Sequence, residues 1–420
     1  MATSSQHPDV LVIGAGVVGA AVAHELAARG AGVTVVDEGP DVGHGCSYAN
    51  AGLLAPAHVE PLTTPQNLAA GLRYLLRRDS PFHLSPSPRL APWLVRFAAA
   101  STPARARRLT ALLRELAWES LAQHRAYAAA GWRTGLSDSG SLDVYLTLER
   151  FATATAGAAG SDGGHGVRVL TAEQARELVP GLGRVAGAVL HEQDATCDTQ
   201  AFARAALAAA TGAGATVRWG THVRRLEPHG GGLRAELDAG PGGAGTVTPG
   251  AVVVAAGLGS TRLLRPLGVR LPMTGGKGYV IDVPPQAGPP MALTFKELKV
   301  VATPYPDRLR FCGTMDLGET GDGLVQRRVD AVRRAAAAGL PGVDTGRPVQ
   351  VWAGQRPCLA DGVPAIGPVR SVPGLHLATG HGMWGLVLAP VTAAHVAATI
   401  TQGLRDDRFA PLAPDRFARG

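Results

Sequence analysis

The apolar residues near the N-terminus fall into three runs of different length. Residues 10–13 and 33–36 are short and fully apolar, whereas residues 17–29 form a longer, mostly apolar run of helical length. Short apolar runs are typical of strands buried in a parallel sheet, and a helix that joins two such strands makes a β-α-β unit. Residues 9–38 therefore predict one such unit, whose helix ends at Gly30.

Farther along the chain the pattern changes from helices to strands. Residues 104–130 have helical periodicity, and residues 252–255 are another fully apolar run. Residues 275–282, 300–304 and 308–315 read as strands separated by Pro and Gly turns, with no helix between them, which predicts an antiparallel sheet. The predicted fold class is therefore α/β with an α+β part.

Three glycines lie at the junction between the first predicted strand and the first predicted helix. Gly14, Gly16 and Gly19 have the G-x-G-x-x-G spacing. In a dinucleotide-binding unit the first glycine permits a tight turn, the second lets backbone N–H groups approach a pyrophosphate, and the third lets the helix pack closely on the strand. Val17 and Val18 begin the helix, whose positive end faces the phosphates. A purely structural β-α-β unit is the alternative.

Two acidic residues follow the second predicted strand. Asp37 stands where an acidic side chain would accept hydrogen bonds from the ribose hydroxyls of an adenosine. Glu38 is the alternative acid, although it lies one residue past the end of the strand. Together with the glycine spacing, this acid predicts that the unit binds an adenine dinucleotide.

The segment after this unit is rich in Gly, Ser and Asn, and it contains the sequence C-S-Y-A-N-A-G from Cys46 to Gly52. With the glycine triplet and the acid, it resembles the FAD-dependent D-amino-acid oxidase superfamily of glycine oxidase and D-amino acid dehydrogenase type, especially the small-subunit branch of bacterial D-amino acid dehydrogenase. The branch often has Ser or Thr where this chain has Cys46, so one hydroxyl contact differs. The resemblance implies that the segment wraps the FAD diphosphate and the isoalloxazine ring through Ser47, Ala49, Asn50, Ala51, Gly52 and Leu53.

Two later segments resemble further cofactor contacts of the same family. Residues 217–220 together with Val223 predict a strand that would run beside the adenine, with the backbone of Val223 as the contact. Ala256 and Gly257 follow the apolar run at 252–255 and resemble the second flavin-binding turn of the family. A domain that binds only a nicotinamide cofactor is therefore less favoured.

The C-terminal third carries two motifs of the same family. Residues 354–367 match its G-x-R-P and D-G-x-P-x-I-G motifs, and the resemblance implies that Arg356 binds the substrate carboxylate beside the flavin. A guanidinium is always charged and its planar fork can donate two hydrogen bonds to one carboxylate. A surface arginine before a turn is the alternative.

The second C-terminal motif spans residues 379–386. The resemblance implies that its loop lies against the pyrimidine edge of the flavin, where N–H groups and a helix dipole stabilise negative charge on the reduced ring. His381 would contact the flavin through its ring or its backbone, and its place between two glycines favours the backbone. The residues of the loop are Gly380, His381, Gly382, Met383, Trp384 and Gly385.

Tyr279 lies in the predicted strand at residues 275–282. It resembles the substrate-domain tyrosine of the family, which would close the pocket over the amino acid. A tyrosine of the hydrophobic core is the alternative.

The resemblance implies a Rossmann-like FAD-binding domain and a discontinuous substrate domain with a mixed or antiparallel sheet. We assign residues 1–78, 165–265 and 352–420 to the FAD-binding domain, and residues 79–164 and 266–351 to the substrate-binding domain.

Composition adds mainly exclusions. The net charge is +7, from 40 Lys and Arg against 33 Asp and Glu, but the arginines are scattered, which argues against a nucleic-acid partner. The four cysteines form no C-x-x-C pair and no histidine lies at ligand spacing, so no metal site is predicted. The N-terminus lacks the pattern of a signal peptide, which predicts a cytoplasmic protein. The insert at residues 65–102 is a lid, a peripheral contact with the inner face of the membrane, or a hairpin packed on its own domain.

The resemblance implies oxidation of the C–N bond of a D-amino acid, by transfer of the α-hydride to flavin N5. The imino acid then hydrolyses to a keto acid and ammonia, and quinone or oxygen takes the electrons. Oxidation of glycine, sarcosine, proline or hydroxyproline is one alternative, and a biosynthetic FAD amine oxidase is another. The side chain of the substrate, the electron acceptor and the oligomeric state stay open.

Overall fold

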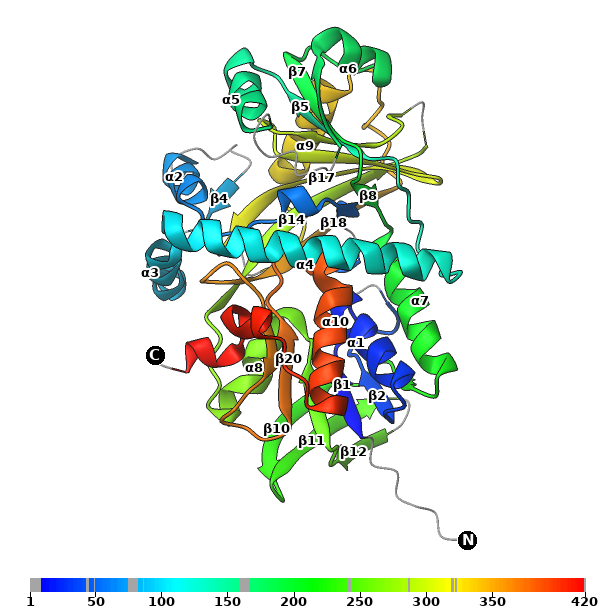
Figure 1. Ribbon diagram of the computed structural model, residues 1–420, viewed down its shortest axis with the longest axis vertical. Coiled ribbons are helices and arrows are strands. Elements are labelled where there is room, and N and C mark those ends of the chain that lie inside the picture. The colour runs from blue at the N-terminus through cyan, green and yellow to red at the C-terminus, as the bar shows by residue number, and fades with distance from the viewer. Residues whose placement is uncertain are drawn as a thin grey trace.

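The computed structural model describes residues 9–42, 45–48, 50–74, 82–85, 87–158, 166–240, 243–285, 288–318, 321 and 323–418. Two large sheets form its framework, and one long helix crosses a face of the molecule at the level where they meet (Figure 1). The helices are α1 (Val17–Ala28), α2 (Pro65–Tyr74), α3 (Ala91–Ala100), the long helix α4 (Pro103–Ala129), α5 (Leu148–Ala158), α6 (Ala172–Leu178), α7 (Thr199–Gly212), α8 (Ser260–Leu264), α9 (Gln326–Gly339) and α10 (Gly385–Gln402).

The first sheet has six strands in the order β19-β20-β13-β1-β2-β9. Neighbours are parallel except for β19 and β20. The predicted β-α-β unit is present in this sheet, with Val10 paired to Val33 on one side and to Ala251 on the other. The bounds are β1 (Val10–Ile13), β2 (Val33–Val36), β9 (Thr216–Arg218), β13 (Ala251–Val254), β19 (Ala365–Pro368) and β20 (Leu375–Thr379).

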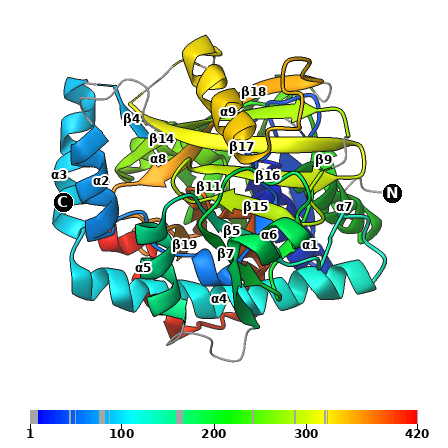
Figure 2. The same cartoon turned by 90° about the horizontal axis from the view of Figure 1, so that it is seen from above.

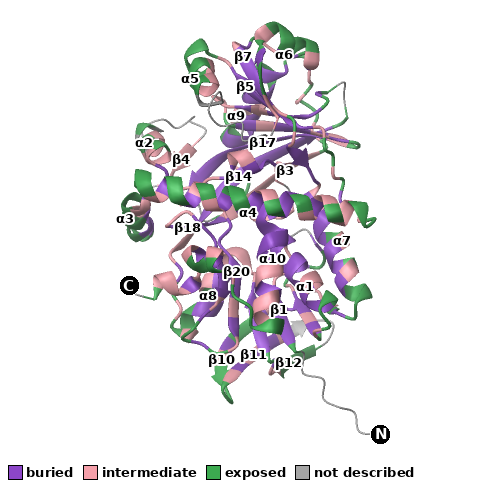
Figure 3. Cartoon of the chain, viewed as in Figure 1, coloured by how far each residue is buried: buried purple, intermediate pink, exposed green. Residues whose placement is uncertain are grey.

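Helix α1 packs unusually close to this sheet. A Cβ atom on Gly19 would overlap the carbonyl oxygen of Gly14, so only glycine permits this approach of helix to strand. On its other sides α1 contacts α7 and α10. Figure 3 shows the resulting burial of α1 and α10, whose apolar side chains belong to the same core.

The second sheet has nine strands, in the order β18-β14-β17-β16-β15-β5-β7-β6, with β4 paired to β17. Its central strands are antiparallel, as predicted, whereas β15 with β5 and β17 with β4 are parallel pairs. Helix α9 covers one face of this sheet (Figure 2). The bounds are β4 (Phe82–Leu84), β5 (Ser141–Tyr145), β6 (Val167–Thr171), β7 (Gly187–His191), β14 (Met273–Val283), β15 (Ala292–Phe295), β16 (Val300–Tyr305), β17 (Arg308–Leu317) and β18 (Gln350–Leu359).

Two smaller sheets complete the described part of the chain. One is the three-stranded sheet β10 (Val223–His229), β11 (Gly232–Gly240) and β12 (Gly243–Val247), and the other pairs β3 (Leu53–Leu54) with β8 (Ala195–Thr196). We predicted one strand from residues 217–220 with Val223. The structure instead divides them, because β9 ends at Arg218 and Val223 begins β10 in another sheet.

The proposed division into domains differs from the strand pairing in two places and from the helix packing in one. Strands β6 and β7 fall within residues 165–265 but pair with β5 in the nine-stranded sheet, and β18, which begins at Gln350, belongs there too. Helix α4 falls within residues 79–164, yet Leu113 and Leu116 on its buried face join the core around α1 and α10. Which strands pair and which core a helix joins depends on the apolar faces that meet in space, and local sequence patterns do not encode this.

The insert at residues 65–102 packs on its own sheet where the structure describes it. Trp93 and Phe97 of α3 are stacked with ring centroids 5.0 Å apart, and both are buried against β17 and β18 residues. Trp93 Nε1 donates a hydrogen bond to the carbonyl oxygen of Cys358 at 3.0 Å. Val95 on the same helix is 69% exposed.

Helix α10 is long and apolar enough to cross a membrane by length and composition alone. It contacts α1 and α4, and 56% of its residues are buried within the protein. The core helix of a globular domain has the same properties.

Candidate cofactor and substrate site

A cavity of about 680 Å³ lies where the carboxyl ends of β1, β2 and β13 face β18 of the nine-stranded sheet. The carboxyl edge of a parallel sheet is where doubly wound folds bind their ligands. The structure brings together most of the residues predicted to bind the cofactor: Gly14, Gly16, Val17, Val18, Asp37, Glu38, Ser47, Val223, Ala256, Gly257, Gly380, His381, Gly382 and Gly385 all line this cavity.

The turn between β1 and α1 has the shape that a pyrophosphate needs. Gly14 has a φ of 104°, and a Cβ atom there would lie 2.7 Å from the carbonyl oxygen of Ala255. A Cβ atom on Gly16 would lie 2.9 Å from Ser47 Oγ. Ser47 Oγ also accepts a hydrogen bond from the N–H group of Val17 at 3.2 Å. Because the N-terminus of a 12-residue helix faces the cavity here, the wall fits an anionic diphosphate.

Asp37 is held in place by the backbone around the cavity. Its Oδ2 accepts a hydrogen bond from the N–H of Ala15 at 2.7 Å, and its Oδ1 accepts one from the N–H of Gly39 at 2.8 Å. A carboxylate oxygen can accept more than one hydrogen bond, so both oxygens keep capacity for ribose hydroxyls. The side chain of Glu38 is 73% exposed, which makes Asp37 the better-positioned acid.

The loop after Ser47 lies farther from the cavity than we predicted. Asn50, Ala51, Gly52 and Leu53 are not among the residues that line it, and Ala49 lies outside the described residues. The loop is instead tied to the nine-stranded sheet through Thr303 of β16 and to the small two-stranded sheet through β8. Asn50 Oδ1 accepts a hydrogen bond from Gly52 N–H at 2.7 Å, the Ala51 carbonyl accepts one from Thr303 Oγ1 at 2.6 Å, and Leu53 pairs with Thr196.

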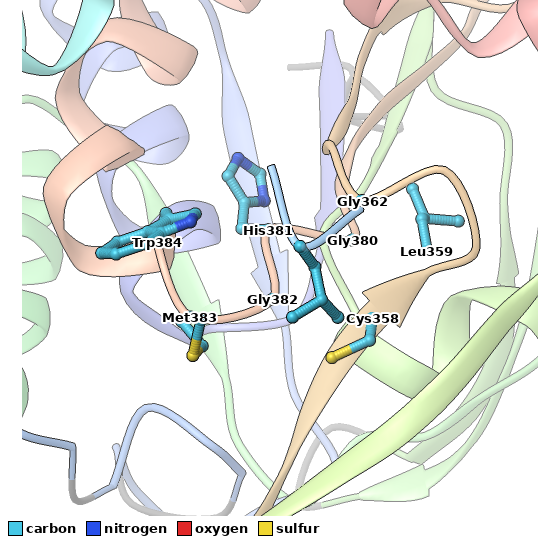
Figure 4. A pocket seen from close by; sticks show the side chains of 9 residues that line it. Cys358, Leu359, Gly362, Gly380, His381, Gly382, Met383 and Trp384 are labelled. Carbon is cyan, nitrogen blue, oxygen red and sulfur yellow. The ribbon is translucent and has the colours of Figure 1, made fainter. Parts of the chain in front are cut away.

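The imidazole ring of His381 is held against helix α10. Its Nε2 lies 3.1 Å from Thr392 Oγ1 inside α10, and burial lowers the pKa of the imidazole to about 3. The ring is therefore neutral, and in Figure 4 it points away from Met383 and Cys358. Gly382 N–H donates to the Pro357 carbonyl at 3.0 Å, which fixes the loop against β18. This arrangement agrees with the backbone role that the flanking glycines favour.

Met383 and Trp384 line a second cavity of only about 10 Å³, beside the large one. Trp384 Nε1 donates a hydrogen bond to the Glu60 carbonyl at 2.7 Å, whereas Met383 is 45% exposed. Figure 4 shows both side chains on the loop at residues 380–385. Gly19 also does not line the large cavity, since its role is helix packing.

Arg356 lies on β18, between two residues that line the large cavity. Its Nη1 donates to the Thr314 carbonyl at 3.2 Å, and its Nη2 lies 3.8 Å from Cys312 Sγ. No carboxylate of the described residues forms an ion pair with it. Burial raises the pKa of the Cys358 thiol to about 12 and also raises the pKa of Cys46, although Arg356 opposes both shifts. Since these two thiols are neutral, the guanidinium charge stays available for a ligand.

Tyr279 does not lie at the cavity, so our assignment of this residue to pocket closure is wrong. Side chains alternate between the two faces of a strand, and Tyr279 shares its face with Ile281 in the core beneath α9, where it is fully buried. Gly278 and Val280 occupy the opposite face, which is the face of Arg356 and Cys312. Tyr279 is therefore a residue of the hydrophobic core, which was the alternative interpretation of this position.

Sequence reasoning missed two aromatic residues on that opposite face. Tyr48 and Trp352 have ring centroids 5.4 Å apart at 52°, and they pack with Val280 and Cys312. Gln350 Nε2 donates a hydrogen bond to Tyr48 Oη. Tyr48 lies within the C-S-Y-A-N-A-G sequence, and its place in that motif was the signal that could have identified it.

A model of the FAD dependent oxidoreductase family matches residues 9–399. The chain belongs to this family. It is 34% identical over 435 residues to D-amino acid dehydrogenase 2 of Ralstonia nicotianae, with 96% of this chain and 99% of that protein covered. The solved glycine oxidase from Geobacillus kaustophilus matches with a TM-score of 0.77 and 25% identity, over 99% of this chain and 100% of that one. L-Proline dehydrogenase from P. horikoshii has the same fold, with a TM-score of 0.75, 19% identity and 99% of both chains covered.

These similarities confirm the resemblance drawn from the sequence motifs. The mixed α/β fold class is confirmed as well, and the family is one of FAD-dependent enzymes. The predicted fold class and enzyme class therefore hold for this chain.

In this FAD-dependent oxidoreductase, a buried ion pair connects the loop after Ser47 to the nine-stranded sheet. Arg310 Nε and Nη2 donate to the two carboxylate oxygens of Asp282, each at 2.7 Å. Arg310 Nη1 also donates to the Asn50 carbonyl at 3.2 Å. A bidentate arginine–carboxylate pair fixes the orientation of its two side chains relative to each other. The Arg310–Asp282 pair therefore fixes the position of the loop relative to the nine-stranded sheet. Sequence reasoning missed both residues.

Proposed function

We propose that the chain binds one FAD and oxidises the C–N bond of a D-amino acid to the imino acid, which then hydrolyses to a keto acid and ammonia. The observation that carries the proposal is Arg356, a guanidinium with no carboxylate partner among the described residues, adjoining a cavity with a diphosphate-binding turn. The 34% identity to a D-amino acid dehydrogenase over nearly the whole chain supports the same substrate class.

The cavity walls fit the parts of FAD in a definite order. The N–H groups at Gly16 and Val17 would donate to the diphosphate, and Asp37 would accept from the ribose hydroxyls. The turn at Ala256 and the loop at residues 380–385 would lie along the ring system. Bound FAD supplies the two-electron acceptor that no side chain can provide.

Arg356 would orient the substrate through its carboxylate. A planar fork that donates two hydrogen bonds fixes both the position and the rotation of the carboxylate, which limits how the α-hydrogen can point. Tyr48 and Trp352 form an apolar wall on the same face of the sheet and would exclude water around the bound amino acid. The substrate amine reacts in its neutral form, and it passes its proton to solvent or to a nearby acceptor before oxidation.

Oxidation of glycine or a secondary amine is the second candidate. It is favoured by the fold match to glycine oxidase, with a TM-score of 0.77 at 25% identity. Both candidates need the same carboxylate clamp, so the α-substituent separates them.

The deciding experiment is anaerobic addition of single substrates to the purified protein, with the visible absorbance of the flavin as the signal. We expect rapid bleaching by several D-amino acids and little bleaching by their L-enantiomers. Bleaching by glycine, sarcosine or proline alone would support the second candidate. Bleaching by amines that have no carboxylate would contradict both.

We also propose an electron acceptor of the quinone type and a cytoplasmic location, with or without contact of the insert with the inner face of the membrane. The relatives' name, dehydrogenase, supports the acceptor. Turnover with substrate should be faster with an artificial dye acceptor than with oxygen. Hydrogen peroxide formed at the rate of substrate loss, with no acceleration by dye, would contradict the acceptor.

A further inference from the structure

Three side chains of metal-ligating type meet outside the cavities described above. His58 ends the short helix η1 (Pro56–His58), Asp143 is the middle residue of β5, and His191 ends β7. One potential ligand atom from each lies within 4.8 Å of the other two. The spacing of these residues along the chain predicts no metal site, because 85 and 48 positions separate them. The fold alone brings them together.

Strand pairing explains why two of the three side chains face the same point. In the antiparallel pair of β5 and β7, Ser141 lies opposite His191 and Asp143 lies opposite Val189. Asp143 and His191 are therefore diagonal neighbours on one face of the sheet. His58 approaches this face from the segment that follows β3, and its ring lies 4.7 Å from that of His191 at 65°.

The distances suit a transition metal. His58 Nε2 is 2.9 Å from Asp143 Oδ2, and His191 Nε2 is 3.7 Å from the same oxygen. Ligand atoms bound at about 2.0–2.2 Å in a tetrahedron are roughly 3.3 Å apart, so small side-chain rotations would complete the geometry. Two imidazoles and one carboxylate are ligands that zinc accepts, with a fourth position left for water.

A second carboxylate stands behind one of the imidazoles. Asp194 Oδ2 is 3.7 Å from His58 Nδ1 and accepts a hydrogen bond from Ser141 Oγ at 2.6 Å. A carboxylate on the far nitrogen of a histidine is the usual way in which a metal-binding imidazole is oriented. At 3.7 Å the two atoms form no hydrogen bond, and His58 Nδ1 has no hydrogen-bond partner among the described residues. A small shift of Asp194 toward this nitrogen would let it fix His58 with Nε2 directed toward the metal.

The cluster also contains an unsatisfied buried atom. Asp143 is 3% exposed, and its Oδ1 has no hydrogen-bond partner among the described residues. A buried carboxylate oxygen without a partner is costly, and a cation that Asp143 binds through both of its carboxylate oxygens would remove that cost. The histidine side chains are 18% and 14% exposed at His58 and His191, which leaves an entry path from solvent.

We propose that His58, Asp143 and His191 bind one zinc-class divalent cation, and that Lys296 competes with it. Lys296 Nζ is 2.9 Å from Asp143 Oδ2, and its side chain is 30% exposed, so it can leave for solvent when the metal enters. The site is independent of the amino acid oxidation proposed above. Its metal would link η1 to β5 and β7 and so hold the segment after β3 against the nine-stranded sheet.

The test is a titration of the chelator-treated, untagged full-length protein, with its flavin bound, by zinc in a calorimeter. We expect one zinc per chain. The variant His191→Ala should weaken binding by about 100-fold or more, since one of three protein ligands is lost. Lys296→Met should tighten it by about tenfold, because a competing positive charge is removed. His229→Ala, at an exposed position on β10, is the matched control and should bind like the parent.

Thermal unfolding keeps the test decisive if a variant folds poorly. Zinc should raise the unfolding temperature of the parent and of Lys296→Met, and it should have no such effect on His191→Ala. Absence of stoichiometric binding in both the parent and Lys296→Met would overturn the proposal. Equal affinity of the parent and His191→Ala would overturn it as well, because the zinc would then be bound elsewhere.

Discussion

The guanidinium of Arg356 lies directly over Gly278 of the neighbouring strand. A Cβ atom at Gly278 would be only 2.5 Å from Arg356 Cζ, so a side chain there cannot coexist with the observed position of the fork. The two residues are diagonal neighbours in the antiparallel pair of β14 and β18, where Gly278 lies opposite Gly354 and Gly276 lies opposite Arg356. A glycine on one strand therefore makes the space for the charged group on the next.

From this relationship we predict that Gly278→Ala displaces the fork without loss of the flavin. Overpacking of this kind typically costs about 1–3 kcal/mol. We expect kcat/KM for the amino acid to fall by roughly one to two decades, measured with a dye acceptor. Gly342→Ala is the control, because nothing lies within 4 Å of its added Cβ. An unchanged kcat/KM in Gly278→Ala would show that the reaction does not depend on the observed position of the Arg356 guanidinium.

Removal of the fork itself should have a larger effect. Arg356→Ala should cost about 3–5 kcal/mol of transition-state binding, or roughly two to four decades in kcat/KM, while FAD is retained. Arg356→Lys should recover only part, since one ammonium cannot reproduce two-bond geometry. Amides of the same amino acids should be poor substrates for the parent and little changed by the substitution. Normal kinetics in Arg356→Ala would make a plain amine oxidase the better interpretation.

The turn at Gly16 should be essential for flavin retention. A Cβ atom added at Gly16 would lie 2.9 Å from Ser47 Oγ, and a leucine side chain would extend farther into the space beside the helix N-terminus. We expect Gly16→Leu to be purified with little or no FAD, measured as the ratio of flavin to protein absorbance. Gly212→Leu, at the exposed end of α7, should retain its flavin. A full complement of FAD in Gly16→Leu would contradict the diphosphate assignment.

His124 should make the protein less stable in mild acid. Burial lowers its pKa to about 4, and its Nε2 lies 3.0 Å from the Leu386 carbonyl. In the unfolded chain His124 is protonated below a pH of roughly 6.5, whereas in the folded protein it stays neutral down to about pH 4. Between these two pH values the unfolded state therefore binds more protons, and the free energy of unfolding falls as the pH falls. The loss is at most about 1.4 kcal/mol per pH unit, and none of it occurs above this range.

Replacement of His124 by glutamine tests this dependence. Gln can donate a similar hydrogen bond without titrating, so His124→Gln should reduce the slope of unfolding free energy against pH between about 4 and 6.5. Denaturant unfolding at several pH values measures the slope. The exposed His229→Gln is the control. An identical slope in His124→Gln and the parent would mean that His124 does not contribute.

Local chemistry accounts for the part of the site that the sequence predicted well. The turn at Gly14 and Gly16, the acid Asp37 and the loop at residues 380–385 depend on backbone geometry and on neighbours within a few positions. A dinucleotide-binding β-α-β unit is short and has the same geometry wherever it occurs, so its residue pattern is enough to predict its shape.

The tertiary structure decided what depends on pairing between distant segments. Whether Tyr279 faces the substrate or the core follows from the register of β14 with β17 and β18, and a shift of one residue would exchange its two faces. The same pairing places Trp352 beside Tyr48, and it joins Arg310 to Asp282. Sequence by itself determined the β-α-β unit with its glycine turn, and it singled out Arg356 as the charged group for which we propose a role in substrate binding. Only the fold decided which side chains surround Arg356, because sheet register and packing depend on contacts between distant segments, and no local sequence pattern contains these contacts.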